Sequence, residues 1–380
     1  MRTADVIIIG AGIIGCACAR RLSSDGLRVL VLDAAFPGAG ATAAGMGHIV
    51  VMDDSQAMFS LTLASREAWA RLAPDLPPRA EYAAAGTLWV AADQEELDAA
   101  GHKHAFLRER GVKAELLDPD SLRGAEPNLR PGLAGGLLVP DDLVVYPPTV
   151  AAWLLGQAVR LGARAVMGSR VVRVESGRVT IADGSVFESP AIVNAGGQWS
   201  QDLTPGLPIR RRKGHLVITD RSPGFCRHQV IELGYIKKAH ASDEDSVAFN
   251  IQPRPTGQVL IGSSRQFDPI DERGHGRPLD HGIDHAILAR MIRRAAEYMP
   301  TLAGLRALRA WTGFRAATPD SLPLIGPHPR IPGLWLATGH EGLGVTNSLG
   351  TADLLADLMA ARTPTIPAEP YSPSRVLGDG

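Results

Sequence analysis

One run near the N-terminus reads Asp5-Val6-Ile7-Ile8-Ile9-Gly10-Ala11-Gly12-Ile13-Ile14-Gly15, and the fold prediction starts from it. Its apolar residues predict a buried strand, and the small residues over 16–24 predict a helix directly after the glycines. A turn at residues 25–26 leads to a second apolar strand over residues 28–32, which ends at Asp33. Strand, glycine turn, helix and acidic strand end in this order form the pattern of a dinucleotide-binding βαβ unit.

Each glycine of this turn has its own physical role. Gly10 permits a tight turn, Gly12 lets the backbone approach the diphosphate, and Gly15 lets helix and strand pack closely. Asp33 stands where a carboxylate accepts hydrogen bonds from the ribose hydroxyls, and it disfavours a 2′-phosphate. The alternative is an ordinary buried βαβ unit with incidental glycines. The pattern alone does not distinguish NAD from FAD.

Length and composition limit the classes of protein that fit. The chain has 380 residues, enough for two domains, and 45% of them are hydrophobic, so a sizeable core is available. The net charge of −1 argues against a nucleic-acid partner. The three cysteines show no disulfide framework and no zinc pattern, and the apolar runs are too short for a membrane span or a signal peptide. We therefore expect a soluble cytoplasmic protein without an integral membrane segment.

A segment of small residues, 36–48, follows Asp33 and contains Ala41, Thr42 and Ala43 before its last glycines. One interpretation is a flexible linker. The other is a backbone that lies against a flat ligand, which small residues permit. Because the apolar run over 49–52 comes next, the chain enters the interior, which favours the second. His48 is either a satisfied polar residue or an active-site group.

Two further strands end at glycines. The strand over residues 191–194 leads to Gly196, and the strand over residues 334–338 leads to Gly342 and a helix predicted over 345–361. An NAD dehydrogenase needs only the junction at Gly10, whereas a long FAD molecule explains all three. The N-terminus of the last helix would then face the flavin pyrimidine ring and stabilise the reduced flavin by up to about 2 kcal/mol.

The rest of the chain predicts a second, mainly antiparallel domain. Consecutive antiparallel strands are expected at 229–238, 247–253 and 258–263, and a basic run at 210–213 is expected to be a solvated face before a strand over 214–219. A strand is also expected over 164–174. His281 and His285 share a face of the helix predicted over 283–299, beside Asp284, but no third ligand supports a metal site, and none is predicted.

Several runs together resemble the FAD-dependent D-amino acid oxidase superfamily, nearest its glycine oxidase, sarcosine oxidase and hydroxyproline or opine dehydrogenase branch. The resemblance covers nearly the whole chain. Beside the first glycine turn it is carried by the runs Ala41-Thr42-Ala43-Ala44-Gly45-Met46, Asn194-Ala195-Gly196-Gly197-Gln198-Trp199-Ser200, Gly313-Phe314-Arg315, Thr318-Pro319-Asp320, Pro323-Leu324-Ile325-Gly326 and Gly339-His340-Glu341-Gly342-Leu343-Gly344. The run over 45–55 is similar to the catalytic subunit of bacterial D-hydroxyproline dehydrogenase or opine oxidases. Relatives often have Arg-Gly-Gln where this chain has Lys213-Gly214-His215.

The expected fold is therefore α/β plus α+β, with a Rossmann-like FAD-binding domain and a mixed, mainly antiparallel substrate domain. The FAD-binding domain is predicted from residues 1–75, 145–205 and 310–380, and the substrate domain from 76–144 and 206–309. The predicted FAD contacts are Gly10, Gly12, Ile13, Ile14, Gly15, Asp33, Ala41, Thr42, Ala43, Gly45, Met46, Gly47, Val171, Ala195, Gly196, Trp199, Gly313, Gly342, Leu343, Gly344, Val345 and Thr346.

The resemblance also implies a chemistry: hydride passes from the Cα of a small amino or imino acid to flavin N5 and leaves an imine. Arg315 stands at the family position that binds the substrate carboxylate, which a guanidinium grips with two parallel hydrogen bonds. A structural ion pair with Asp320 is the alternative for this arginine. The residues considered for contacts with the substrate amine or ring are His48, Tyr235, Lys237, His340 and Glu341.

Several points remain open at the level of sequence. D-Hydroxyproline is the favoured substrate, and a glycine or sarcosine oxidase that uses oxygen is the alternative. An NAD-linked dehydrogenase and a non-catalytic flavin electron-transfer subunit are further possibilities. The resemblance allows small partner subunits with flavin or iron–sulfur centres, and a peripheral place at the inner face of the membrane. No cysteine lies near Arg315 for a thioether to the flavin, whereas a covalent link through His48 stays open.

Overall fold

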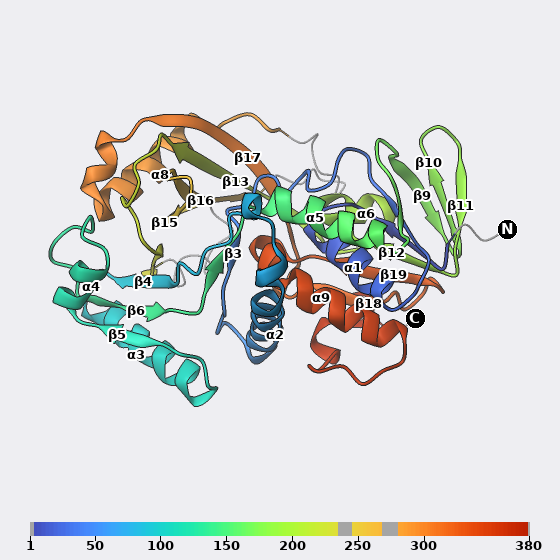
Figure 1. Cartoon of the computed structure of the whole chain (residues 1–380), viewed down its shortest axis with the longest axis horizontal. Helices are drawn as coiled ribbons and strands as arrows, with labels where there is room; N and C mark the ends of the chain where they lie inside the picture. The colour runs from blue at the N-terminus through green and yellow to red at the C-terminus, as the bar shows by residue number, and fades with distance from the viewer. Residues whose placement is uncertain (1–3, 235–244, 268–279, 379–380) are drawn as a thin grey trace. The chain divides into compact units, whose positions relative to one another are not determined.

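The structure is a computed structural model that describes residues 4–234, 245–267 and 280–378 (Figure 1). Its contacts divide the chain into two compact units. Unit 1 comprises Met1–Ala80, Tyr146–Arg211 and Phe314–Gly380, and unit 2 comprises Glu81–Val145 and Arg212–Gly313. The predicted domain boundaries, at residues 75, 145, 205 and 310, fall a few residues from these. That unit 1 binds FAD and unit 2 contributes to substrate binding remains a prediction.

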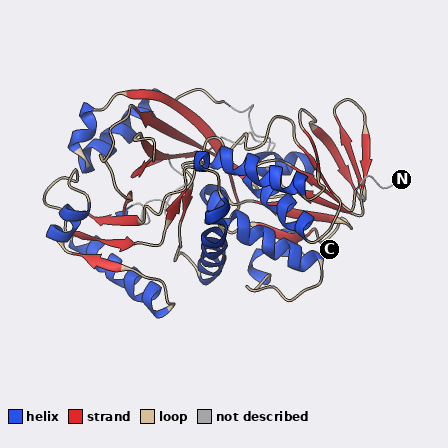
Figure 2. Ribbon diagram, in the orientation of Figure 1, coloured by secondary structure: helices blue, strands red, loops and turns tan. Residues whose placement is uncertain are grey.

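Unit 1 is built on a six-stranded sheet in the order β18-β19-β12-β1-β2-β8. All neighbouring strands in it are parallel except β18, which runs antiparallel to β19. Helix α1 packs against both α5 and α9 beside this sheet, and α2 packs against α9. The alternation of strand and helix can be followed in Figure 2. The bounds are β1 Val6–Ile9, α1 Ile13–Ser24, β2 Val29–Leu32, α2 Gln56–Leu72, α5 Pro147–Arg160, β8 Arg164–Val166, β12 Ala191–Asn194, β18 Leu324–Pro327, β19 Leu334–Thr338 and α9 Gly344–Met359.

The local sequence explains the first βαβ unit. Every residue of β1 and β2 is apolar and buried, as expected for parallel strands covered on both faces. A Cβ on Gly15 would lie 1.9 Å from the carbonyl oxygen of Gly10, so only glycine lets α1 approach the end of β1 this closely. Gly10 itself has a φ of 105°, which residues with a Cβ rarely adopt. The predicted strand, turn and helix are confirmed.

The register of the parallel strands brings their carboxyl ends to one edge. Ile9 at the end of β1 pairs with Leu32 on one side and with Asn194 on the other, and Asn194 pairs with Leu336 of β19. The residues that follow these strands therefore emerge side by side. In open parallel sheets, ligands bind at this edge.

The remaining elements of unit 1 include a separate three-stranded sheet, β11-β10-β9, that forms the predicted hairpin. The single strand expected over 164–174 is wrong: β8 belongs to the main sheet and β9 to the small one, because Gly168 turns the chain with a φ of 71°. The bounds are β3 His48–Ile49, η1 Ala73–Asp75, η2 Pro78–Ala80, β9 Val171–Glu175, β10 Arg178–Ile181, β11 Val186–Glu188, η3 Gly197–Trp199, α6 Ser200–Leu203, η5 Glu341–Leu343, η6 Glu369–Tyr371 and α10 Ser374–Leu377.

Unit 2 contains most of an eight-stranded sheet in the order β17-β13-β16-β15-β14-β4-β6-β5. Strands β14 and β4 pair in parallel, whereas β13, β15, β16, β6 and β5 pair antiparallel with their neighbours, so a mainly antiparallel second domain is confirmed. The chain enters unit 2 for the second time within β13 and leaves it within β17. The bounds are β4 Thr87–Ala91, α3 Gln94–Glu109, β5 Glu115–Leu117, α4 Pro119–Ala125, β6 Gly135–Val139, β7 Leu143–Val144, β13 Arg210–Thr219, β14 Gln229–Glu232, β15 Ser246–Pro253, β16 Val259–Phe267, α8 His285–Tyr298, η4 Pro300–Gly304 and β17 Ala307–Ala317.

Two expectations about the polar residues of this region are corrected. The basic run over 210–213 is the first part of β13 rather than a solvated face before it. The side chain of Lys213 is only 12% exposed and forms an ion pair with Asp280, 3.1 Å away. Helix α8 begins at His285, and the Asp284 carboxylate caps it by accepting from the N–H groups of residues 286 and 287. His281 therefore does not share a helix face with His285.

Candidate functional site

The first glycine turn is closed by the acidic residue predicted to hold the ribose. Asp33 Oδ2 accepts a hydrogen bond from the N–H of Ala11 at 2.6 Å, and Oδ1 accepts from the N–H of Ala35 at 2.7 Å. A carboxylate oxygen accepts about two hydrogen bonds, so both oxygens keep capacity for ribose hydroxyls. Asp33 thus fixes the turn and presents its carboxylate at the sheet edge.

The N-terminus of α1 offers backbone donors for an anion. Thr42 Oγ1 accepts from the N–H of Ile13 at 3.0 Å, which leaves the threonine proton free to donate. Within the described residues, no side chain accepts from the N–H of Ile14 or Gly15, which also lack partners inside the helix. A diphosphate fits such a helix end, both by hydrogen bonding and by the helix dipole.

The small-residue segment joins two helix ends. A Cβ on Gly45 would lie 4.0 Å from Val345 Cγ2 in the first turn of α9, and the carbonyl oxygen of His48 accepts from Thr346 Oγ1 at 2.9 Å. At its other side the segment contacts α1 through Thr42. Met46 and Gly47 are buried, whereas Ala41 and Ala43 are exposed. The segment is therefore packed inside unit 1, and the linker interpretation is wrong.

The second glycine junction lies directly beside the first. The N–H of Ala195 donates to the carbonyl of Ile9 at 2.9 Å, and a Cβ on Gly10 would lie 2.5 Å from the carbonyl oxygen of Ala195. The Asn194 side chain is fully buried and holds the junction by accepting from the N–H of Gly196 at 3.1 Å. Trp199, which is 38% exposed, lies 3.3 Å from the Cβ position of Gly40.

The third junction places Arg315 next to a glycine. An isolated β-bridge joins Ala317 of β17 to His340, and the Cβ position of Gly342 lies 3.7 Å from Arg315 Nε. Glu341 has a φ of 46°, a strained value for a residue with a side chain. Such strain persists where the surroundings enforce it, as functional sites often do. The turn before α9 thus contains the strained Glu341 between glycines, and the side chain of Arg315 from β17 lies beside it.

His340 has a different environment from the one expected for a substrate contact. The residue is 7% exposed, and its Nε2 lies 2.9 Å from Thr351 Oγ1 of α9. Burial lowers the pKa of His340 to about 3, so the ring is neutral near pH 7. These contacts give His340 a role in joining the turn to α9, and they do not support a role in catalysis.

The first turn of α9 carries unsatisfied polar groups. No side chain caps the helix, and its N-cap residue is Leu343. Asn347 is fully buried, yet neither its Oδ1 nor its Nδ2 has a hydrogen-bond partner among the described residues. Buried amides are normally paired, so an orphan at this place indicates a group that unit 1 binds. Sequence reasoning missed Asn347, because the resemblance is carried by the glycines before it.

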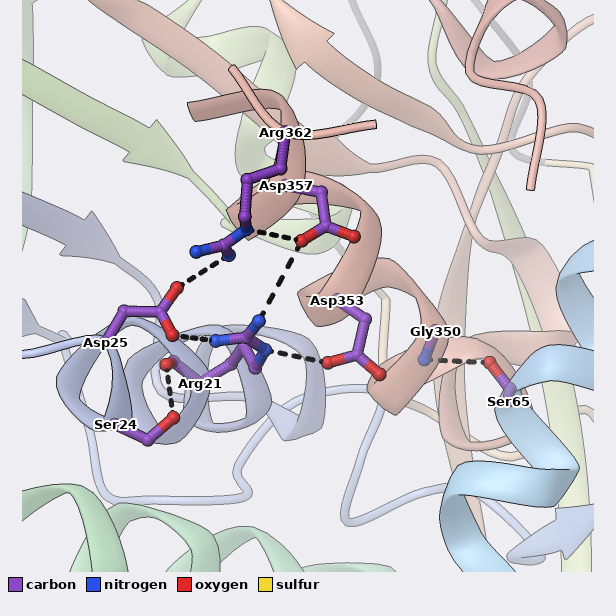
Figure 3. Close-up of polar contacts among 8 residues, drawn as sticks. All are labelled: Arg21, Ser24, Asp25, Ser65, Gly350, Asp353, Asp357 and Arg362. Carbon is purple, nitrogen blue, oxygen red and sulfur yellow. Dashed lines mark hydrogen bonds and ion pairs between the residues drawn. The ribbon is translucent and has the colours of Figure 1, made fainter. Parts of the chain in front are cut away.

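Charged residues link α1 to the C-terminal half of α9 (Figure 3). Arg21 forms ion pairs with Asp25 and Asp353, the second at 2.9 Å, and reaches Asp357 at 3.8 Å. Arg362 contacts Asp25 at 2.7 Å and Asp357 at 2.9 Å. The network fixes the two helices to each other beyond their N-terminal turns.

Other predicted residues lie elsewhere or are differently paired. Val171 contributes its side chain to the hydrophobic core with Ile9 and Leu32, so only its main chain is left for FAD. Gly313 is the last residue of unit 2. Asp320 pairs with Arg375, with Nε and Oδ2 2.7 Å apart, rather than with Arg315 as the alternative had it. Tyr235 and Lys237 lie outside the described residues.

These features fit FAD. Four predicted cofactor segments contact one another within unit 1: the first turn, the segment 41–48, the junction at Gly196 and the segment from Gly342 into α9. A hydrogen bond of 2.8 Å between Ser200 Oγ and Thr338 Oγ1 also ties the second junction to the third. The donor set suits a diphosphate at α1 and a polar ring edge at α9. That these residues hold FAD is a proposal carried by this geometry.

Neither a metal centre nor a membrane helix is found among the described residues. No group of three or more histidine, cysteine, aspartate or glutamate side chains there is arranged to hold a metal ion. No helix in these parts of the chain is both long and apolar enough to cross a membrane.

Comparisons with known proteins agree with this arrangement. Glycine oxidase of Geobacillus kaustophilus (strain HTA426) is 27% identical over 98% of this chain and 97% of that protein, and hydrogen cyanide synthase subunit HcnC of Pseudomonas aeruginosa is 26% identical over 98% and 96%. The crystal structure of glycine oxidase from Geobacillus kaustophilus has a TM-score of 0.85 at 26% identity and covers 97% of this chain and 98% of that one. L-Proline dehydrogenase from P. horikoshii shares the fold, with a TM-score of 0.86 at 22% identity over 98% of each chain. The family described as "DAO: FAD dependent oxidoreductase" matches residues 5–358. Because this match spans nearly the whole chain, the protein belongs to the DAO family of FAD-dependent oxidoreductases.

Proposed function

We propose that the protein oxidises the C–N bond of a small amino or imino acid. The observation that carries the proposal is the position of Arg315, whose Nε lies 3.7 Å from the Cβ position of Gly342 in the turn before α9. A guanidinium there, in the unit that holds the three glycine junctions, is suited to bind a carboxylate. Family membership adds the redox cofactor, and relatives at 27% and 28% identity are named glycine oxidases.

Arg315 would orient the substrate. Its guanidinium stays protonated at any physiological pH and binds a carboxylate through two parallel hydrogen bonds. Holding the carboxylate fixes the direction of the Cα–H bond, which is an orientation effect rather than proton transfer. The half-buried environment of Arg315 strengthens this contact relative to one in bulk water.

The chain's other residues would hold the cofactor. Bound FAD supplies the hydride-accepting chemistry, so the reaction needs no strong acid or base from the protein. The N-terminus of α1 with Thr42 binds the diphosphate, and Asp33 binds the ribose. The partial positive charge of the N-terminal turn of α9 would stabilise negative charge on the reduced cofactor. His48 and Glu341 remain proposed neighbours of the substrate amine.

D-Hydroxyproline is our first proposed substrate, because the run over 45–55 resembles the catalytic subunit of bacterial D-hydroxyproline dehydrogenase. A glycine or sarcosine oxidase that uses oxygen is the second candidate, which the names of the relatives favour. HcnC is by its name a subunit of hydrogen cyanide synthase. By analogy we propose that small electron-transfer subunits accept electrons from this chain.

The test is an anaerobic screen of the FAD-loaded protein. We expect D-hydroxyproline to bleach the yellow absorbance of the flavin faster than its L-isomer, glycine or sarcosine, and an artificial dye to support turnover. Admission of oxygen then separates an oxidase, which recolours quickly, from a dehydrogenase, which does not. If no amino or imino acid bleaches the flavin, the proposed reaction is wrong and a non-catalytic role is favoured.

A variant of Arg315 tests the anchoring role. Hydrogen bonds to a charged group contribute about 1.5–3 kcal/mol, so Arg315→Ala should raise KM by about 10- to 150-fold while FAD stays bound. Arg330→Ala is the matched control, because it removes an exposed arginine from the same unit. An unchanged KM in Arg315→Ala would show that the carboxylate is held elsewhere.

A further inference from the structure

Helix α2 makes an unusual contact with the first turn of α9. The indole Nε1 of Trp69 donates to the carbonyl oxygens of Val345 and Thr346, both at 3.2 Å. Trp69 is fully buried, so its N–H has no access to water. A single side-chain donor is therefore shared between two consecutive peptide groups of one helix.

One of these two peptide groups lies at the open end of the helix. The carbonyl of Val345 belongs to the same peptide as the N–H of Thr346, and the carbonyl of Thr346 to the same peptide as the N–H of Asn347. Because α9 begins at Gly344, the N–H of Thr346 has no partner within the helix, whereas that of Asn347 can reach the carbonyl of the N-cap residue Leu343. A hydrogen bond received by the carbonyl polarises the peptide and makes its N–H a stronger donor.

A second observation indicates that a ligand meets this helix end. Asn347 is fully buried there, and both polar atoms of its side chain lack a partner within the described residues. Thr346 is held by a separate bond of 2.9 Å from its Oγ1 to the carbonyl of His48. The turn therefore keeps a fixed direction, and the Asn347 side chain in it has no hydrogen-bond partner among the described residues.

We propose that Trp69 is a positioning residue for FAD: by fixing and polarising the first peptides of α9, it strengthens the helix end that stabilises the reduced flavin. The proposal rests on the cofactor of the family and not on the substrate proposed above. It adds to the proposed FAD site a residue of α2, a helix that contains none of the glycine motifs.

The experiment measures the two-electron midpoint potential of bound FAD in the full chain, without substrate. Trp69→Phe keeps an aromatic ring and removes the N–H. We expect the equilibrium constant for flavin reduction to fall about 3- to 10-fold, which for a two-electron couple is about 14 to 30 mV towards negative potential. FAD affinity and the unfolding temperature are measured on the same samples.

Two control variants separate this effect from a loss of packing. Ser65→Ala removes the hydrogen bond of 2.9 Å that the N–H of Gly350 donates to Ser65 Oγ, which joins the same two helices one turn further along (Figure 3). Trp89→Phe removes another buried indole, whose Nε1 has no partner among the described residues. Both should leave the potential unchanged. An unchanged potential in Trp69→Phe overturns the proposal, and so does an equal shift in Ser65→Ala.

A second measurement applies if Trp69→Phe does not retain FAD. Fluorinated tryptophan, incorporated in place of all tryptophans of the natural chain, makes the indole N–H a stronger donor and preserves the ring. The proposal then expects a more positive potential, and a potential that stays constant or falls contradicts it. Because neither measurement uses an amino acid, failure of the substrate proposal would leave this result unaffected.

Discussion

The buried ring of His340 makes stability depend on pH in a calculable way. Burial lowers its pKa to about 3 in the folded chain, whereas an exposed histidine titrates near 6.5. Between these values the unfolded chain binds a proton that the folded chain does not, so the free energy of unfolding falls as the pH falls. At about pH 5 the expected loss is about 2 kcal/mol, from 1.5 pKa units at about 1.4 kcal/mol each.

The assay compares urea unfolding of the FAD-loaded protein at neutral pH and near pH 5, followed by release of FAD. His340→Gln removes the titrating ring and keeps a side chain that can bond to Thr351 Oγ1, now 2.9 Å from the imidazole. The natural protein should lose about 2 kcal/mol more than this variant on acidification. The other histidines are the same in both proteins, so their effects on the pH dependence of stability cancel when the two losses are subtracted.

His102→Gln serves as the control, because His102 is exposed on α3 and should not alter the pH dependence. The reasoning is refuted if the natural protein and His340→Gln lose the same stability between the two pH values. It is also refuted if the natural protein gains stability on acidification, because the ring would then be protonated in the fold.

Three further predictions follow from close contacts in unit 1. Gly350→Ala should lower the free energy of unfolding by about 1–3 kcal/mol, and with it the unfolding temperature, because the new Cβ would lie 2.4 Å from Ser65 Oγ. Adding Ser65→Ala should recover part of this loss. An unchanged unfolding temperature in Gly350→Ala would contradict the close packing of the two residues. Asp33→Ala should weaken FAD binding about 10- to 100-fold in titrations of the apoprotein, and equal affinity would remove Asp33 from the site. Arg21→Gln should lower the free energy of unfolding by less than about 1 kcal/mol at low salt, and calorimetry at high salt should show no difference between the variant and the natural protein. A loss of stability that persists at high salt would show that Arg21 stabilises the two helices by packing rather than by charge.

The first βαβ unit could be predicted because the residues that determine it are close together in the sequence. The apolar run, the glycine spacing and Asp33 each follow from one short stretch, and the observed turn satisfies all three. The three glycine junctions could also be grouped from the sequence, since parallel strands place their carboxyl ends at one edge. The family match and the similarity to the glycine oxidase structure confirm the predicted fold class and the FAD cofactor.

Contacts between distant residues could not be predicted in this way. Trp69 lies 276 residues before Val345, and nothing in the sequence near Trp69 indicates a bond to a helix end. Asp320 stands five residues from Arg315, which suggested a pair, yet Arg375 takes both of its carboxylate oxygens. The basic run over 210–213 looked solvated because its acidic partners, such as Asp280, are remote in sequence.

The division of unit 1 into three chain segments has a consequence for biosynthesis. Strand β1 ends at Ile9, but β12 begins at Ala191 and β19 at Leu334. At about 5–20 residues per second, the ribosome delivers β19 roughly 15–65 s after β1. One edge of the nascent β1–β2 pair has no neighbouring strand until β12 is made, and α9 does not exist until β19 has been made. If α9 forms part of the FAD site as proposed, FAD can load only when translation is nearly complete, and a chain truncated before β19 should not acquire the cofactor.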